Sequence, residues 1–235
     1  MTEATAVPTI QLENPFAPLT GLCELVMVRH GEQQLTRETS VEHAVDAPLS
    51  DLGRRQVEAV GERLASTEVH AVYSSPLRRA FETGEEIGRH HGLVPEAMDE
   101  LREFHPWLGL EPGRSIHDLL SADEVRSIFR THIRTKKFDA FPYAEDRHLF
   151  RERINTALGR IIDRHLGQRV VVTCHGGVIN ALLAAVVGSD QDLPVRVHHT
   201  SISVFRGADT RRSVISVNDF AHVLDLQDSV NPFNL

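Results

Sequence analysis

The sequence predicts an α/β fold with a mostly parallel central sheet, and three short apolar runs are the main reason. They cover residues 25–28, 71–73 and 170–174, and none of them alternates between apolar and polar side chains. A short run without alternation is typical of a strand that is buried on both faces, as in a parallel sheet. At 235 residues the chain is also small enough for one hydrophobic core, so we expect one domain.

Each of these runs is followed by signals that predict a helix. After the first run, Ser50 is expected to cap a helix whose apolar residues repeat at helical spacing. After the second run, Ser75 is expected to be the cap and Pro76 the first residue of a helix that extends to about position 90. After the third run, a helix is expected to begin at residues 175–177 and to stop near Gly188.

The remaining segments complete this α/β pattern. A helix is expected over residues 147–166, and two strands, residues 201–205 and 213–217, follow near the end of the chain. Residues 104–146 contain several prolines and a helix around 116–133, and we interpret them as an insertion that covers the carboxyl edge of the sheet. The apolar face of the 147–166 helix is expected to comprise Leu149, Ile154, Leu158, Ile161, Ile162 and Leu166.

The N-terminal segment differs from the predicted domain. Residues 1–20 lack periodicity and are expected to be a mobile arm, which leaves residues 21–235 as the single domain. The arm has acidic residues and prolines but no basic stretch followed by an apolar one, so it does not resemble a secretory signal. Cys23 and Cys174 lie in or beside apolar runs and are expected to be reduced and buried. These features predict a cytoplasmic protein.

Charge and composition exclude several classes of partner. The net charge of −8 argues against a nucleic-acid or anionic-membrane partner held by bulk electrostatics. No apolar run approaches the roughly 18 residues that a membrane span needs. A small anionic substrate stays compatible with the composition, because a few arginines can reverse the field inside a pocket. The oligomeric state is left open.

A polar cluster follows each of the three apolar runs. The clusters are residues 29–32 (Arg-His-Gly-Glu), 74–79 (Ser-Ser-Pro-Leu-Arg-Arg) and 174–177 (Cys-His-Gly-Gly). The carboxyl ends of parallel strands meet at one edge of a sheet, which is where open α/β folds place their sites. Two histidines and one or two arginines gathered there would repel one another without an anion. A phosphoryl group would supply that anion, with arginines and helix N-terminal amides as donors and with glycines allowing close approach of the backbone.

Other phosphatase nucleophiles are excluded by the sequence. A cysteine nucleophile would need an arginine six positions further on, and Cys174 has Asn180 there. An Asp-x-Asp motif after an early strand, a glycine-rich loop ending in Gly-Lys-Ser/Thr and a Gly-x-Ser-x-Gly elbow are all missing. Histidine is therefore the predicted nucleophile.

The polar clusters together resemble the signature of the histidine phosphatase superfamily, which includes cofactor-dependent phosphoglycerate mutases. The resemblance extends over about residues 22–224 and implies a three-layer α/β/α, phosphoglycerate mutase-like fold, with the insertion at about 104–146 capping the site. The blocks that carry it, in the family's order, are residues 25–32, Pro48-Leu49-Ser50 with Gly53 and Gln56, residues 74–80, residues 101–103 and residues 174–177.

The resemblance implies a role for individual residues. His30 would attack phosphorus and form a phosphohistidine, and Glu103 would protonate the leaving oxygen and later activate water. Arg29, Arg79 and His175 would hold the equatorial phosphoryl oxygens.

Gly176 would contribute to phosphate binding beside these side chains. No metal and no other cofactor is implied, because the arginines and histidines supply the positive charge.

Three departures from the family pattern affect the expected pocket. Residues 104–109 read Phe-His-Pro-Trp-Leu-Gly, where the family usually continues with Gly and then Trp-Glu-Gly. Thr36 stands where many members have asparagine, and Gly84 replaces a helical alanine. Because Glu103 lies beside the first departure, Glu100 stays open as an alternative proton donor.

The pairs His90-His91 and His198-His199 are expected to be solvated surface histidines. A zinc site would need three ligands with fixed spacing, and the sequence shows no such set.

The sequence thus predicts a metal-independent phosphomonoesterase of the histidine acid phosphatase type, acting on a small phosphorylated metabolite. Mutases of this family carry a tryptophan and a longer pattern of charged residues soon after the nucleophile, which residues 33–45 lack. Mutase-type phosphoryl transfer is therefore the second hypothesis. A third is an inactive module that binds phosphorylated ligands, which would be marked by loss of His30, Glu103 or His175, and all three are present.

Overall fold

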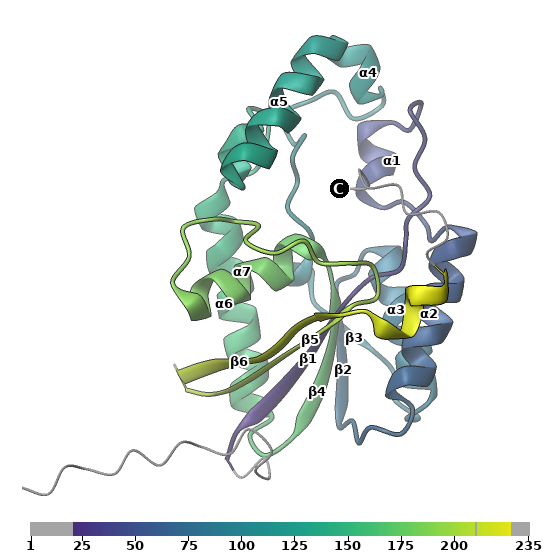
Figure 1. Cartoon of the computed structure of the whole chain (residues 1–235), viewed down its shortest axis with the longest axis vertical. Helices are drawn as coiled ribbons and strands as arrows, with labels where there is room; N and C mark the ends of the chain where they lie inside the picture. Colours follow the sequence, from purple (N-terminus) through teal and green to yellow (C-terminus); the bar gives the residue numbers. More distant parts are fainter. Residues whose placement is uncertain (1–20, 210, 227–235) are drawn as a thin grey trace, which may run out of the picture.

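The centre of the protein is a six-stranded sheet in the order β3-β2-β4-β1-β5-β6. The computed structural model describes residues 21–209 and 211–226 (Figure 1). β3, β2, β4 and β1 run parallel, β5 joins β1 in antiparallel orientation and β6 joins β5 in the same way, so a mostly parallel sheet is confirmed. The strands are β1 (Cys23–Arg29), β2 (Ala71–Ser74), β3 (Glu96–Ala97), β4 (Arg169–Cys174), β5 (Ile202–Ala208) and β6 (Arg211–Asp219).

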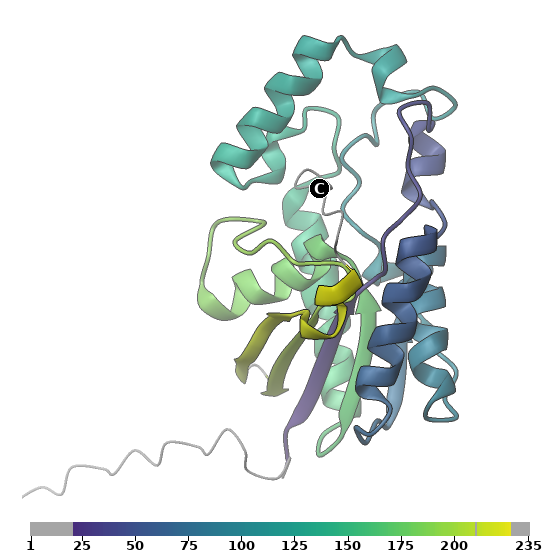
Figure 2. The same ribbon diagram turned by 45° about the vertical axis from the view of Figure 1, so that its right-hand side comes forward.

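Helices cover both faces of this sheet, which confirms the three-layer α/β/α fold (Figure 2). None of the helices within the described ranges has the length and apolar character needed to cross a membrane. The helices are α1 (Val41–Val45), α2 (Asp51–Leu64), α3 (Arg78–Arg89), α4 (Ile116–Leu119), α5 (Ala122–Thr135), α6 (Arg147–Arg164) and α7 (Gly176–Val187), with short 3₁₀ helices η1 (Asp99–Leu101), η2 (Phe138–Ala140) and η3 (Ala221–Leu226).

β1 connects the two apolar layers. Its side chains alternate between the faces of the sheet. Leu25 and Met27 pack into the cluster that contains residues of α6 and α7, and Val26 and Val28 pack into the cluster that contains residues of α2 and α3. Because both faces are covered, an uninterrupted apolar run is the sequence that this strand requires.

Several expectations about single elements are confirmed. Ser50 caps α2 by accepting a hydrogen bond from the amide of Gly53 at 3.0 Å, and α7 ends at Gly188, whose φ is +70°. Cys23 and Cys174 are buried and free. The predicted arm, residues 1–20, lies outside the described residues.

The start of α3 differs from the prediction. The helix begins at Arg78 instead of Pro76, and Ser75 is not its cap. The Ser75 hydroxyl oxygen lies 2.8 Å from Nε2 of His175, so it is engaged across the sheet. The first amide of the helix, that of Arg78, donates instead to Oδ1 of Asp46 at 2.7 Å. A residue distant in sequence thus replaces the expected local cap.

Two other helix predictions are corrected. The helix expected over 116–133 is two helices, because Ser121 caps α5 in a capping box with Glu124 and ends the continuity with α4. Leu149 and Leu166 do not belong to the buried face of α6, since 65% of the first and 47% of the second is exposed. The other four residues of that predicted face are buried.

The predicted insertion, which contains α4 and α5, stands over the carboxyl edge of the sheet. α1 precedes the insertion in the chain and lies across from α4 and α5 over the same edge (Figures 1 and 2). The two sides meet where Ser40 forms an isolated β-bridge with Ser115. The amide of Val41 also donates to the carbonyl of Arg114 at 2.9 Å.

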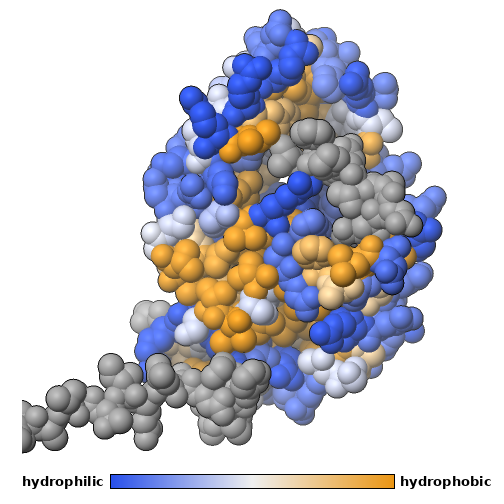
Figure 3. Space-filling view, in the orientation of Figure 1, coloured by the Kyte–Doolittle hydropathy of each residue, from blue (hydrophilic) through white to orange (hydrophobic). Residues whose placement is uncertain are grey.

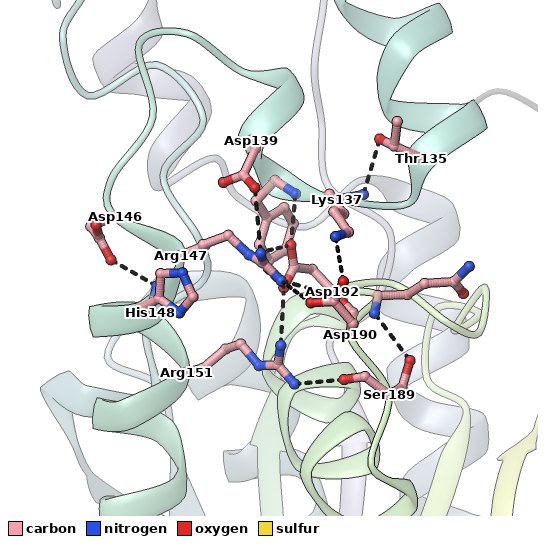
Figure 4. A network of polar contacts seen from close by, with 12 residues as sticks. Thr135, Lys137, Asp139, Asp146, Arg147, His148, Arg151, Ser189, Asp190 and Asp192 are labelled. Atoms are coloured by element: carbon pink, nitrogen blue, oxygen red, sulfur yellow. Dashed lines mark hydrogen bonds and ion pairs between the residues drawn. The ribbon is translucent and has the colours of Figure 1, made fainter.

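A buried ion pair fastens this insertion to the body of the protein (Figure 4). Arg147, the first residue of α6, donates from Nη2 to Oδ1 of Asp192 at 3.0 Å, and the Asp192 side chain is fully buried. The other carboxylate oxygen of Asp192 accepts from the amide of Phe138 at 2.8 Å. Asp192 therefore links the loop after α7 to both η2 and α6.

Candidate active site

The polar clusters at the strand ends come together at one edge of the sheet, as predicted. The ring centroids of His30, after β1, and His175, after β4, are 5.0 Å apart. Arg79, in the first turn of α3, directs Nε at Nε2 of His30 over 3.1 Å, and its Nη2 lies 3.4 Å from Nδ1 of His175. All three side chains are buried. In Figure 3 the face below α4 and α5 is hollowed, and hydrophilic side chains gather at the hollow.

The His30 ring is held as a neutral imidazole whose Nε2 carries a lone pair, and this lone pair accepts the hydrogen bond from Nε of Arg79. Its Nδ1 lies 2.7 Å from the carbonyl oxygen of Gly31, which can only accept, so Nδ1 carries the proton. Burial, followed by the positive charge of Arg79, keeps the pKa of His30 well below its ordinary value. A neutral ring with this tautomer directs a nucleophilic nitrogen into the site.

Two guanidinium groups lie beside this nitrogen, that of Arg79 buried and that of Arg29 partly buried. Burial lowers the pKa of Arg29 and of Arg79 to about 10, so both stay charged at neutral pH. Each is positioned by one carbonyl group, Val197 for Arg29 at 2.6 Å and Val45 for Arg79 at 2.7 Å. Nε of Arg29 is buried and has no hydrogen-bond partner in the described part of the chain. Such a donor is suited to an oxygen of a bound anion.

Glu103 is the carboxylate that reaches the site, and Glu100 does not. Glu103 accepts hydrogen bonds from the amides of Phe104 at 2.9 Å and Gly177 at 3.1 Å, and burial raises its pKa above the ordinary value. Glu100 is partly exposed and pairs with Arg160 on α6. A partly buried carboxyl group with a raised pKa is suited to giving and taking a proton.

Two glycines make this arrangement possible at the start of α7. A Cβ atom on Gly177 would stand 2.3 Å from Oε1 of Glu103. A Cβ atom on Gly176 would lie 3.8 Å from Nε of Arg29, so the backbone passes close to that guanidinium group. The predicted residue Gly176 thus lies with Arg29, His30, Arg79, His175 and Glu103.

Gly31 has a different role from the one expected. The sequence suggested that it lets the backbone approach a ligand, but a Cβ atom there would stand 2.5 Å from the carbonyl oxygen of Gly53. Its absence lets the end of β1 pack against α2. Gly84 is explained in the same way, because a Cβ atom there would lie 2.7 Å from Oγ1 of Thr173.

The prediction of solvated surface histidines is wrong for His199, which lies at the site. His198 stacks on Phe220 with ring centroids 4.1 Å apart, and His199 places its ring 5.6 Å from that of His30. The residues of the first pair, His90 and His91, are each partly buried. The signal that could have found His199 is its position three residues before β5, which pairs with β1.

No three histidine, cysteine, aspartate or glutamate side chains gather as a possible metal site within residues 21–209 and 211–226.

The sequence and fold of this chain match known proteins. Residues 25–220 match the model of the histidine phosphatase superfamily, branch 1. Phosphoglycerate mutase-like protein 4 of Arabidopsis thaliana is 35% identical over 85% of this chain and 86% of its own length. The metal-independent phosphoserine phosphatase of the same plant is 27% identical over 85% of this chain and 83% of its own length.

A solved structure agrees with these matches. The mycobacterial glucosyl-3-phosphoglycerate phosphatase in complex with inorganic phosphate superimposes with a TM-score of 0.67 and 27% identity, over 85% of this chain and 99% of the other. Residues 25–220, which the family model matches, contain every strand end that contributes to the site. This protein therefore belongs to the histidine phosphatase superfamily, branch 1.

Proposed function

We propose that this protein hydrolyses phosphomonoesters of small metabolites through a phosphohistidine formed on His30. The observation that carries the proposal is the neutral His30 ring, whose Nε2 lies 3.1 Å from the charged guanidinium group of Arg79. Nε2 attacks phosphorus, the bond from phosphorus to the leaving oxygen breaks, and Glu103 gives its proton to that oxygen. In the second step Glu103 takes a proton from water, the water oxygen bonds to phosphorus, and the P–N bond breaks to release inorganic phosphate.

The guanidinium groups of Arg29 and Arg79 supply the positive charge that this reaction requires, while burial and these arginines keep the pKa of His175 well below its ordinary value. Arg29, Arg79 and His175 hold the three equatorial oxygens of the phosphoryl group and stabilise the charge on them in the transition state. His175 is positioned for this by Ser75, whose hydroxyl oxygen lies 2.8 Å from its Nε2. The proposed reaction therefore needs no metal ion, which fits the name of one Arabidopsis relative.

The same phosphohistidine could pass its phosphoryl group to a second substrate instead of water. The 35% identical relative is named as phosphoglycerate mutase-like, which favours this second candidate. Against it, residues 33–45 lack the tryptophan and the charged pattern that resemble a mutase. Incubation with 3-phosphoglycerate, followed by ³¹P NMR, separates the two. Hydrolysis yields inorganic phosphate, whereas mutase activity yields a new phosphomonoester signal.

Trapping of the intermediate tests the proposal directly. Acid quenching during turnover of a ³²P-labelled phosphomonoester should leave an acid-labile phosphoprotein, and His30→Ala should abolish both this label and phosphate release. His90→Ala, at the residue that follows α3 and pairs with Glu86, is the control and should behave like the wild type. Turnover in His30→Ala above one tenth of the wild-type value would contradict the assignment. A wild-type protein that binds phosphate without turnover would favour the inactive binding module.

We further propose a cytoplasmic location, which the two free, buried cysteines fit.

A further inference from the structure

His199 is placed beside His30 by the topology of the sheet. β1 pairs with β4 on one side and with β5 on the other, and β5 is antiparallel to β1. The residues that precede β5 therefore lie at the same edge as those that follow β1 and β4. As a result the His30 ring has an imidazole neighbour from each flanking strand, His175 at 5.0 Å and His199 at 5.6 Å between centroids.

Hydrogen bonds to main-chain groups fix the position of the segment that carries His199. The carbonyl of Val197 accepts from Arg29 at 2.6 Å, and the amide of His198 donates to Oδ1 of Asn218 at 2.7 Å. The amide of Thr200 donates to the carbonyl of Arg29 at 3.0 Å. The main chain on both sides of His199 is thus tied to the site and to the end of β6, without any contribution from its ring.

The His199 ring itself makes no hydrogen bond to the part of the chain that the structure describes. The other two histidines of the site each have a ring nitrogen engaged, with Gly31 for His30 and with Ser75 for His175. Burial, followed by the positive charge of Arg29, keeps the pKa of His199 well below its ordinary value. The side chain of His199 is partly buried, and its neutral imidazole carries one N–H that is available to an acceptor in the site.

We propose that His199 contacts the substrate, and that its ring N–H donates a hydrogen bond to an oxygen of the phosphoryl group held at His30. The proposal rests on the function proposed above. Orientation of the nucleophile does not require His199, because the bond from Nδ1 of His30 to Gly31 already fixes that ring. An anion at Nε2 of His30 would instead supply the acceptor that the His199 ring lacks.

Two substitutions separate a hydrogen-bonding role from a ring-packing role. His199→Gln keeps an N–H donor and removes the ring, whereas His199→Phe keeps a ring against His30 and removes the donor. The readouts are the inhibition constant of inorganic phosphate and the KM and kcat for p-nitrophenyl phosphate. The control is His198→Phe, which preserves the stacking on Phe220 and the backbone amide that Asn218 binds.

We expect His199→Phe to raise the inhibition constant of inorganic phosphate about tenfold, the size of one hydrogen bond to a charged group. The KM should rise more than kcat falls, and His199→Gln should stay within about threefold of the wild type for the same reason. The control should match the wild type. The proposal is overturned if the Phe variant retains phosphate affinity, if both variants lose it equally, or if the Gln variant alone loses it.

Two further measurements keep the test decisive. If either variant fails to fold, as judged by thermal melting, His199→Leu and His199→Asn repeat the comparison with smaller side chains. Calorimetric binding of inorganic phosphate is measured in all variants, independently of turnover. A wild-type protein without phosphatase activity contradicts the proposed function, whereas an active wild type with unchanged phosphate binding in His199→Phe contradicts this inference alone.

Discussion

Nε of Arg79 lies 3.1 Å from Nε2 of His30, so a guanidinium N–H is directed at the lone pair of the proposed nucleophile. This lone pair cannot attack phosphorus while it accepts that hydrogen bond. A bound phosphoryl oxygen competes for the same donor, since a charged acceptor binds a guanidinium group more strongly than a neutral ring nitrogen does. We therefore expect substrate binding to free the proposed nucleophile as it positions Arg79.

Arg79→Lys should reduce kcat by roughly 10²–10³-fold, the usual cost of removing one positioned donor from a developing oxyanion. Lysine keeps the charge but cannot contact His30, Val45 and the phosphoryl group through one planar group. Arg78→Lys is the matched control, because Arg78 is exposed on the same turn of α3. Steady-state kinetics with p-nitrophenyl phosphate compare the two, and equal activities would remove Arg79 from the mechanism.

The proton donor can be identified by comparing the activity of variants on substrates with different leaving groups. An alkoxide needs a proton as the P–O bond breaks, whereas a nitrophenolate does not. Glu103→Gln should therefore lower kcat/KM for an alkyl phosphate by about 10²–10⁴-fold and affect p-nitrophenyl phosphate far less. Glu100→Gln should stay near the wild type, since Glu100 pairs with Arg160 away from the site. The reverse ranking would assign the acid to Glu100.

The pH dependence of kcat/KM should reveal the titration of the same carboxyl group, that of Glu103. Burial raises the pKa of Glu103, so its protonated form persists to higher pH than that of an exposed glutamate. The protonated form is the one that the first step needs. We therefore expect kcat/KM for an alkyl phosphate to fall as pH rises through the Glu103 pKa, with no such fall in Glu103→Gln. An identical alkaline decline in the variant would assign it to another group.

Activity should survive exhaustive treatment with EDTA. Arg29 and Arg79 remain charged at neutral pH and supply the positive field that a metal ion provides in other phosphatases. Phosphate release is measured before and after chelation. Loss of activity that zinc or magnesium restores would contradict the mechanism.

Asp192→Asn should lower the free energy of unfolding by roughly 3–5 kcal/mol, because it leaves Arg147 without its buried partner. Asp139→Asn is the control: Asp139 also pairs with Arg147, but 62% of its side chain is exposed, and the expected loss is about 1 kcal/mol or less. Urea denaturation of both variants measures the difference. Similar losses would mean that the ion pair with Asp192 is no stronger than a surface one.

The sequence predicted the centre of the site because that centre follows from strand ends. His30 and His175 come directly after β1 and β4, the strands that the apolar runs predict, and parallel pairing alone brings such positions together. His199 escaped prediction because it precedes its strand, and only the antiparallel placement of β5 beside β1 brings it to the same edge. The start of α3 could not be predicted for a related reason. The side chain that accepts a hydrogen bond from its first amide belongs to Asp46, which is remote in the chain and cannot be identified from local spacing.

The strand order has a consequence for the growing chain. β4 separates β1 from β2, yet its residues, Arg169–Cys174, follow both of them by about a hundred positions or more. During synthesis His30 and Arg79 emerge early, but no sheet can hold them in register until the strand between them has left the ribosome. A nascent chain that ends before β4 therefore contains His30, the proposed nucleophile, but lacks His175 and the sheet that would hold Arg79 beside it. The proposed site can therefore form only after β4 has been synthesised.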